Sequence, residues 1–140
     1  MSSVKINFSN TAGAMKAVHG IGQPPMLGMN FDMFHYLTEA QIPYSRLHDV
    51  GCYLSGRLVD IHCVFRNFDA DPFDPASYDF AFTDKLITAL IEAGVEPYFR
   101  LGETIENYCD IKAYNINPPK DNLKWAQICE GIIRHYTEGW

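Results

Sequence analysis

A near-identical five-residue string occurs twice in this chain and restricts the fold more than any other feature. The sequence reads PYSRL at residues 43–47 and PYFRL at residues 97–101, and a Glu-Ala pair lies a few residues before each copy. Both strings have the length and the flanking residues of a short strand, and helical spacing precedes each of them. Strands that follow helices in regular alternation are parallel and are joined by right-handed crossovers.

Three segments of the chain carry the apolar spacing of a helix. The first is predicted from a cap at Asn30 or Asp32 to about residue 40, and the second from about residue 82 to 93 with Gly94 as its C′ residue. The third begins after its cap, Asp121, and has the most regular apolar stripe in the chain. Each of these helices follows a predicted strand, so the chain contains three strand–helix units.

The three strands are predicted at residues 16–25, 43–51 and 95–102. A further short strand is predicted at 59–65, and the run of Asp and Pro at 67–77 is typical of turns. Nothing in the composition resembles a linker, so the prediction is one domain over residues 1–140.

The alternation of side chains within the repeated strands indicates what kind of sheet they form. Tyr44, Arg46 and His48 fall on one face of their strand, and Ser45, Leu47 and Asp49 fall on the other. In a doubly wound sheet both faces meet helices and should be apolar. A face with Tyr, Arg and His is better suited to the inside of a closed α/β barrel. The alternative for Arg46 and for Arg100 is a buried guanidinium paired with a structural carboxylate.

Polar side chains follow both repeated strands, at the strand ends where parallel α/β folds bind their ligands. His48 and Asp49 follow the first copy, and Glu103, Thr104, Glu106 and Asn107 follow the second, with Tyr53, Tyr108 and Tyr114 nearby. Carboxylates and an imidazole can bind sugar hydroxyls while aromatic rings stack on a sugar face, so a carbohydrate ligand is predicted; the alternative is solvated loop residues. The candidate substrate-binding residues are Arg46, His48, Asp49, Glu103 and Asn107.

Other classes of partner and cofactor find little support in the sequence. The net charge of −6 argues against nucleic acid, since no basic stripe is available to contact phosphates. Residues 20–22 lack the full dinucleotide-binding pattern, and no G-x-S-x-G motif occurs. The aspartates at 69–74 do not have the spacing of a calcium loop and are interpreted as turn residues. We therefore predict no cofactor and no metal.

The remaining cysteines and histidines are interpreted as structural residues or are given no role. The four cysteines, Cys52, Cys63, Cys109 and Cys129, lack metal-binding spacing and are predicted to be reduced thiols in packed or partly buried positions. His35 and His135 fall in helices and are predicted to be structural, whereas His19 and His62 belong to no pattern. The chain starts without the pattern of a signal peptide and has no 18-residue apolar run, so a soluble, unexported protein with no membrane partner is expected, either cytoplasmic or of a location that the sequence does not specify.

Three strings together resemble one known family. They are YSRLHDV at 44–50, YDFAFTDKLITALIEAGVEPYFRLG at 78–102 and PPKDNLKWAQICEGIIRHY at 118–136, and their order and spacing are similar to glycoside hydrolase family 39. This is the family of β-xylosidase and α-L-iduronidase. The resemblance covers residues 18–140 and implies a (β/α)8 TIM barrel, of which this chain would be the N-terminal portion, about three βα units. Asp49 and Arg100 depart from the family pattern and indicate a divergent branch.

The resemblance also implies a mechanism and a limit. Family members are retaining enzymes with an acid/base glutamate after strand four and a nucleophilic glutamate near the end of strand seven. Both would lie beyond Trp140, so no catalytic residue is assigned here, Glu138 included, and the isolated chain is expected to be inactive. Arg46 and His48 match the family's second-strand motif, which supports the catalytic carboxylates and the sugar.

Two alternatives from other classes stay open. One is a non-catalytic carbohydrate-binding or interaction module derived from the same barrel, and the other is a small flavodoxin-like domain, which would need about five strands. Because three parallel strands leave open edges, self-association through those edges is also expected.

Overall fold

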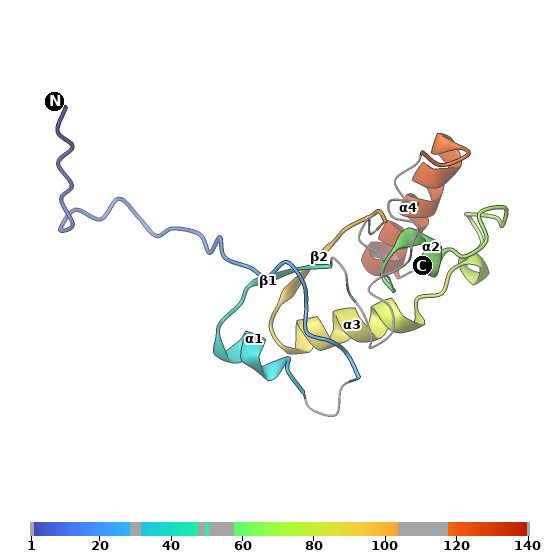
Figure 1. Cartoon of the computed structure of the whole chain (residues 1–140), viewed down its shortest axis with the longest axis horizontal. Helices are drawn as coiled ribbons and strands as arrows, with labels where there is room; N and C mark the ends of the chain where they lie inside the picture. The colour runs from blue at the N-terminus through green and yellow to red at the C-terminus, as the bar shows by residue number, and fades with distance from the viewer. Residues whose placement is uncertain (1, 29–31, 48–49, 51–57, 104–117, 140) are drawn as a thin grey trace, which may run out of the picture.

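The computed structural model describes residues 2–28, 32–47, 50, 58–103 and 118–139 (Figure 1). This part of the chain is a mixed α/β arrangement in which a pair of short strands is flanked by helices. Its elements in chain order are α1 (His35–Glu39), β1 (Tyr44–Leu47), α2 (Ile61–Val64), the 3-10 helix η1 (Pro75–Ser77), α3 (Ala81–Glu92), β2 (Glu96–Phe99) and α4 (Asn122–Glu138).

The strands are parallel, as the alternation of strands and helices predicted. In the register of β1 with β2, Tyr44 lies beside Glu96 and Leu47 lies beside Phe99. The predicted strand at 16–25 is reduced to one parallel bridge, in which Ile21 pairs with Ser45. Two hydrogen bonds hold this bridge: the Ile21 N–H donates to the Tyr44 carbonyl at 3.0 Å, and the Arg46 N–H donates to the Ile21 carbonyl at 2.9 Å. The order across the sheet is therefore Ile21, β1, β2.

The glycine before Ile21 has a direct reason. A Cβ on Gly20 would lie 2.9 Å from the backbone oxygen of Tyr44, which is closer than real Cβ contacts. Only glycine lets the first segment approach β1 closely enough to form the bridge.

The two repeated strings are not paired position by position. Arg46 lies beside Tyr98, so the two copies are displaced by two residues relative to each other. Because strand side chains alternate with a period of two, this even displacement keeps equivalent side chains on the same face. The predicted parity of the faces is preserved although the register differs from the sequence repeat.

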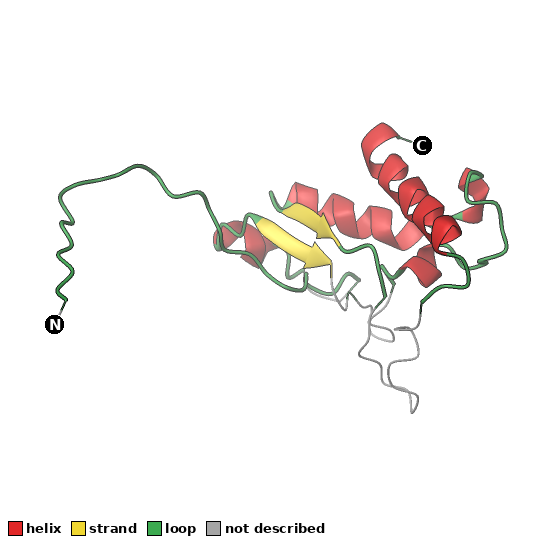
Figure 2. Ribbon diagram, turned by 90° about the horizontal axis from the view of Figure 1, so that it is seen from above, coloured by secondary structure: helices red, strands yellow, loops and turns green. Residues whose placement is uncertain are grey.

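Helices cover one face of the strand pair. Leu47 is fully buried and packs in one apolar cluster with Leu37 of α1 and with Leu86 and Leu90 of α3. Phe99 of β2 packs on the same cluster and also on the second cluster, formed mainly by α2 and α4. In Figure 2 the two strand arrows lie in front of α3, so the face of the strand pair that the helix covers is turned away from the viewer.

The second cluster contains an element of a different type from the one predicted. Residues 59–65 were predicted to form a strand, but Ile61–Val64 form the short helix α2. Apolar residues at 59, 61 and 65 fit a period of two, yet the residues buried in the second cluster are Ile61, Val64 and Phe65, which have helical i, i+3, i+4 spacing. Packing against Ile128 and Ile132 of α4 favours the helix over the strand.

The ends of the longer helices follow the predictions. Asp121 caps α4, and its Oδ1 accepts the N–H of Leu123 at 2.8 Å and that of Lys124 at 3.1 Å. Gly94, the C′ residue of α3, has a φ of +78°, which favours glycine. The first helix is shorter than predicted: α1 begins at His35 and has no side-chain cap, so the predicted cap at Asp32 is wrong, and Asp32 instead accepts the Phe34 N–H at 2.8 Å in the turn before the helix.

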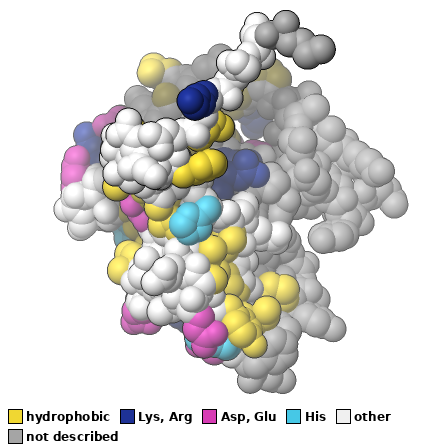
Figure 3. All heavy atoms as spheres, turned by 90° about the vertical axis from the view of Figure 1, so that its left-hand side faces the viewer, with side chains coloured by type: hydrophobic (Ala, Val, Ile, Leu, Met, Phe, Trp, Pro, Cys, Tyr) yellow, Lys and Arg dark blue, Asp and Glu magenta, His cyan; other side chains and the backbone are white. Residues whose placement is uncertain are grey.

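Residues 2–18 are exposed and form neither helix nor strand, and Figure 1 shows them projecting away from the rest. Seen from the side of this segment, apolar side chains are interspersed with charged ones and histidine (Figure 3). Among the described residues, none of the helices has the length and apolar character needed to span a membrane.

Candidate functional site

The predicted substrate-binding residues fall into two groups. Arg46 and Glu103 belong to the described part of the chain. His48, Asp49 and Asn107 lie outside the described residues, as do Thr104, Glu106 and the three tyrosines that follow the strands.

Arg46 lies on the uncovered face of the strand pair. It is exposed, and its neighbours on that face, Tyr44 and Tyr98, keep 42% and 68% of their surface exposed. Ser45 and Leu47 on the opposite face are fully buried. The face with the aromatic and basic side chains therefore points away from the helices, as the alternation of side chains predicted. None of the residues that the structure describes covers this face.

Arg100 follows β2 directly and makes a buried ion pair. Its Nη2 donates to Oδ1 of Asp60 at 2.8 Å, and the Asp60 side chain is fully buried. Its Nη1 donates to the backbone oxygen of Glu103. This is the alternative that the sequence left open for Arg100, a guanidinium paired with a structural carboxylate.

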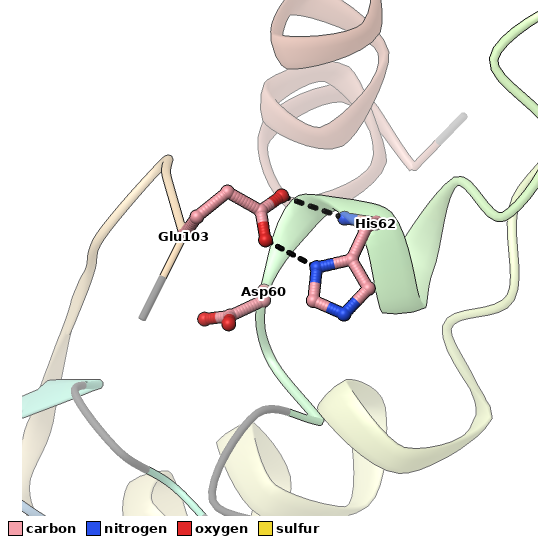
Figure 4. Close-up of side chains that lie close together, drawn as sticks. All are labelled: Asp60, His62 and Glu103. Carbon is pink, nitrogen blue, oxygen red and sulfur yellow. Dashed lines mark hydrogen bonds and ion pairs between the residues drawn. The ribbon is translucent and has the colours of Figure 1, made fainter. Parts of the chain in front are cut away.

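The segment after β2 is fastened to the start of α2. The Ile61 N–H donates to the Gly102 carbonyl at 3.2 Å. One oxygen of the Glu103 carboxylate accepts the His62 N–H at 3.0 Å, and the other contacts Nδ1 of the His62 ring (Figure 4). A backbone bond and a side-chain pair together fix the position of residues 100–103 relative to Asp60 and His62.

His62 is the centre of this cluster. Its Nε2 lies 3.4 Å from Sγ of Cys63, while its Nδ1 faces Glu103. Hydrogen bonds with Cys63 and Glu103 raise the pKa of His62 from 6.5 to about 10, and partial burial opposes them. His62 is therefore an imidazolium at neutral pH, and Glu103, whose side chain is 13% exposed, is its carboxylate partner.

Asp60, His62 and Glu103 also offer atoms of the kind that a divalent cation binds. Their nearest ligand atoms lie within 4.8 Å of one another. These atoms are already engaged with protein groups, because Arg100 binds the Asp60 carboxylate and His62 binds that of Glu103. A cation would have to compete with a guanidinium and an imidazolium, so the geometry favours an ion-pair network over a metal centre.

The same contacts limit what the two carboxylates can do chemically. Asp60 and Glu103 are close enough to suggest the carboxyl pair of a glycosidase. Each carboxylate is already bound to a cationic side chain, Asp60 to Arg100 and Glu103 to His62, so neither is free to face a glycosidic bond. The cluster therefore positions the end of β2 and the residues after it.

Sequence reasoning found Glu103 but missed its partners. Asp60 and His62 belong to the segment predicted as a strand, where alternation would have put Asp60 and His62 on the face opposite Ile61. The available signal was Asp60 placed directly before apolar residues at 61, 64 and 65, which is typical of a helix start. That interpretation would have placed His62 and Cys63 in the first turn of a helix, where the structure has them partly buried.

The other titratable candidates have structural contacts. Asp71 and Asp74 accept the N–H groups of Phe73 and Ala76 at 2.9 Å each, so the prediction of turn residues is confirmed for them. The Nε2 of His135 lies 2.8 Å from Oδ1 of Asp84, and its ring stacks on that of Phe80, as predicted for a structural histidine. Of the cysteines, Cys63 and Cys129 are partly buried free thiols, and Cys52 and Cys109 lie outside the described residues.

Comparison with known proteins gives three findings. Residues 22–140 match the model of the family described as glycosyl hydrolases family 39. A β-xylosidase from Geobacillus stearothermophilus is 22% identical over 89 residues, which are 59% of this chain and 18% of that protein. The crystal structure of a glucosidase from Croceicoccus marinus is similar with a TM-score of 0.59 and 28% identity, over 86% of this chain and 24% of that one. The chain thus spans about a fifth to a quarter of the length of these relatives.

Proposed function

The chain belongs to glycosyl hydrolases family 39, and from this membership we propose that it supplies the first three strand–helix units of a (β/α)8 barrel that hydrolyses O-glycosidic bonds. A xyloside-type or related sugar is the proposed substrate, because one relative is named a β-xylosidase and another a glucosidase.

The observation that carries this proposal is the one-sided packing of the parallel strands. Helices α1, α3 and α4 all contribute to clusters on the face of Leu47 and Phe99. The opposite face, with Tyr44, Arg46 and Tyr98, is exposed. A doubly wound sheet would carry helices on both faces, whereas a barrel carries them outside and keeps the inner face for its own side chains. One-sided packing supports the barrel.

The edge of β2 away from β1 supports continuation of the same sheet. An apolar groove of about 370 Å³ is lined by Pro97 of β2, by Leu101 just after it, and by residues of α3 and α4, among them Ile91 and Ile133. Ile91 is 61% exposed and Ile133 is 48% exposed, although both belong to the apolar spacing of their helices. Apolar surface next to an open strand edge is what a further strand of a barrel would cover.

In this proposal the chain binds and orients sugar, and a pair of glutamates from other strands performs the reaction. One glutamate attacks the anomeric carbon, and the other first protonates the leaving group and then activates water. Arg46 contacts the sugar or the catalytic carboxylates from the inner face, together with His48 and Asp49 at the end of the same strand. Glu103 and Asn107 are proposed to act at the end of β2, with Glu103 held in place by His62.

The test is a glycosidase assay with nitrophenyl xyloside and nitrophenyl glucoside, run on the 140 residues alone and on the complete product of the gene. The 140 residues are expected to release no nitrophenol above a heat-killed control. A complete gene product that carries both glutamates is expected to hydrolyse at least one substrate with retention of configuration at the anomeric carbon. Inversion, or no hydrolysis of any glycoside, would overturn the proposal.

An Arg46→Gln variant of the complete gene product tests the role of the inner face. We expect kcat/KM to fall by about 10-fold or more, which corresponds to roughly 1.4 kcal/mol of transition-state binding. Lys85→Gln, on the exposed side of α3, is the matched control and should leave kcat/KM unchanged. Sugar binding by the 140 residues with no hydrolysis by the complete gene product would instead favour a carbohydrate-binding module.

A further inference from the structure

Cys63, His62 and Glu103 have the relative positions of a nucleophile, an imidazole in hydrogen-bond contact with it and the carboxylate that orients the imidazole. The Cys63 Sγ lies 3.4 Å from the His62 Nε2, which is within hydrogen-bond reach of a sulfur atom. The other ring nitrogen, Nδ1, contacts the Glu103 carboxylate, and the Glu103 carboxylate also accepts the His62 backbone N–H (Figure 4). Two contacts from one carboxylate fix the ring so that Nε2 points at the sulfur.

Cys63 also lies at the wall of a hollow. Cys63 is partly buried, and together with His62 it lines an open hollow of about 460 Å³ between α2 and the start of α3. Arg66 and Asp79 form part of the wall and are joined to each other at 2.7 Å. A hollow of this size admits a small molecule, in contrast to the enclosed site of an inert structural thiol.

The charged groups around the hollow leave the imidazole of His62 next to the sulfur. The Nε2 of His62 faces Sγ of Cys63 at 3.4 Å, and contacts with Cys63 and Glu103 raise the pKa of His62 to about 10. The nearby carboxylates are each paired with a cation: Glu103 with His62, Asp79 with Arg66, and Asp60 with Arg100. The one cation next to the sulfur is therefore not opposed by an unpaired carboxylate among the described residues that face it.

We propose that Cys63 is a reactive thiol and a modification site for small soft electrophiles, activated by His62, which Glu103 orients. This goes beyond sugar hydrolysis and does not depend on it. With an alkyl halide the sulfur forms an S–C bond, the carbon–halogen bond breaks, and halide leaves. With hydrogen peroxide the sulfur forms an S–O bond, the O–O bond breaks, and the departing hydroxide takes up a proton and leaves as water; the sulfur is oxidised by two electrons to the sulfenic acid and the peroxide is reduced.

The test uses iodoacetamide at pH 6.5 and reads each cysteine separately. Trypsin places Cys63 in residues 58–66 and Cys129 in residues 125–134, so mass spectrometry of the digest reports the two rates independently. An ordinary thiol is about 1% thiolate at this pH. An imidazole positioned against the sulfur activates it for attack, so we expect a net gain in rate of about 5-fold or more.

Cys63 in the folded protein is therefore expected to react about 5-fold or more faster than the same residue in urea-unfolded protein. Cys129 is expected to react more slowly folded than unfolded, because burial raises the pKa of its thiol. His62→Asn and Glu103→Gln should each reduce the folded rate of Cys63 to that of the unfolded chain or below. His35→Asn, an exposed histidine of α1, is the matched control and should change nothing.

The Cys129 rate also reports whether a variant is folded. If His62→Asn raises the Cys129 rate to the unfolded value, the variant has lost its structure and Glu103→Gln provides the comparison. If both variants unfold, the unsubstituted protein still tests the proposal, through the ratio of the Cys63 alkylation rate in folded protein to that in unfolded protein. A ratio for Cys63 at or below one, or an unchanged ratio in a folded His62→Asn protein, would overturn the proposal.

Discussion

The ion pair between Arg100 and Asp60 should be the most costly polar contact to break in the described part of the chain. The Asp60 side chain is fully buried and the Arg100 side chain is 23% exposed. In Arg100→Met the carboxylate stays buried and loses its guanidinium. Removing one partner of a buried pair costs about 3–5 kcal/mol. Because Arg100 retains some solvent contact, we expect the lower end of that range, about 3 kcal/mol.

The assay is urea denaturation of the 140-residue chain, followed by far-UV circular dichroism and by fluorescence of Trp125 at the second cluster. With a slope of about 2 kcal/mol per molar urea, a loss of 3 kcal/mol lowers the midpoint by about 1.5 M. The double variant Asp60→Leu with Arg100→Met removes both charges, and it should recover at least half of that loss.

A solvent-exposed pair provides the control. Arg66 and Asp79 are 2.7 Å apart, but their side chains are 72% and 41% exposed. Arg66→Met should therefore cost less than about 1 kcal/mol. The reasoning is refuted if Arg100→Met costs no more stability than Arg66→Met. It is also refuted if the double variant loses as much stability as Arg100→Met and Asp60→Leu lose together, because burial of the pair would then not determine its contribution.

Three further outcomes are expected from the same measurements. Leu86→Ala, at a fully buried position of α3, should cost about 3–5 kcal/mol, and a loss below 1 kcal/mol would contradict the assigned core. Asp121→Ala removes the cap of α4 and should cost about 1 kcal/mol, whereas Asp121→Asn should restore most of it; equal losses would contradict capping. The raised pKa of His62 stabilises the fold fully below about pH 6.5, and this contribution declines until it is lost above about pH 10. Because the His62 side chain is 40% exposed, the expected size is about 1 kcal/mol, and His62→Asn should flatten stability between these pH values; an unchanged profile would contradict the assignment.

Local chemistry was sufficient for the features that the sequence predicted correctly. The helix beginning at Asp121 and the helix ending before Gly94 were predicted from a cap and a C′ residue, which act within one turn of the backbone. The parallel arrangement and the buried face of Leu47 followed from alternation, because a strand side chain has only two sides to choose from. The resemblance to family 39, confirmed by the family match over residues 22–140, rests on such local strings in a fixed order.

Features that depend on which segments meet were beyond the sequence. Residues 59–65 carry both a period of two and an i, i+3, i+4 pattern, and contact with α4 decides between them. The two-residue displacement between the repeated strands is set by how the strands pack, which their near-identical sequences do not encode. Glu103 was identified by its place after a strand, but its partner His62 lies 41 residues earlier and becomes visible as a partner only in three dimensions.

The sequence by itself determined where helices start and stop, which side of each strand is apolar, and the family to which the chain belongs, since these are properties of neighbouring residues. The tertiary structure alone decided that Arg100 binds Asp60 and that His62 lies between Glu103 and Cys63. The physical reason is that a charged or nucleophilic side chain takes its properties from groups within a few ångströms, and folding chooses those groups from distant parts of the chain.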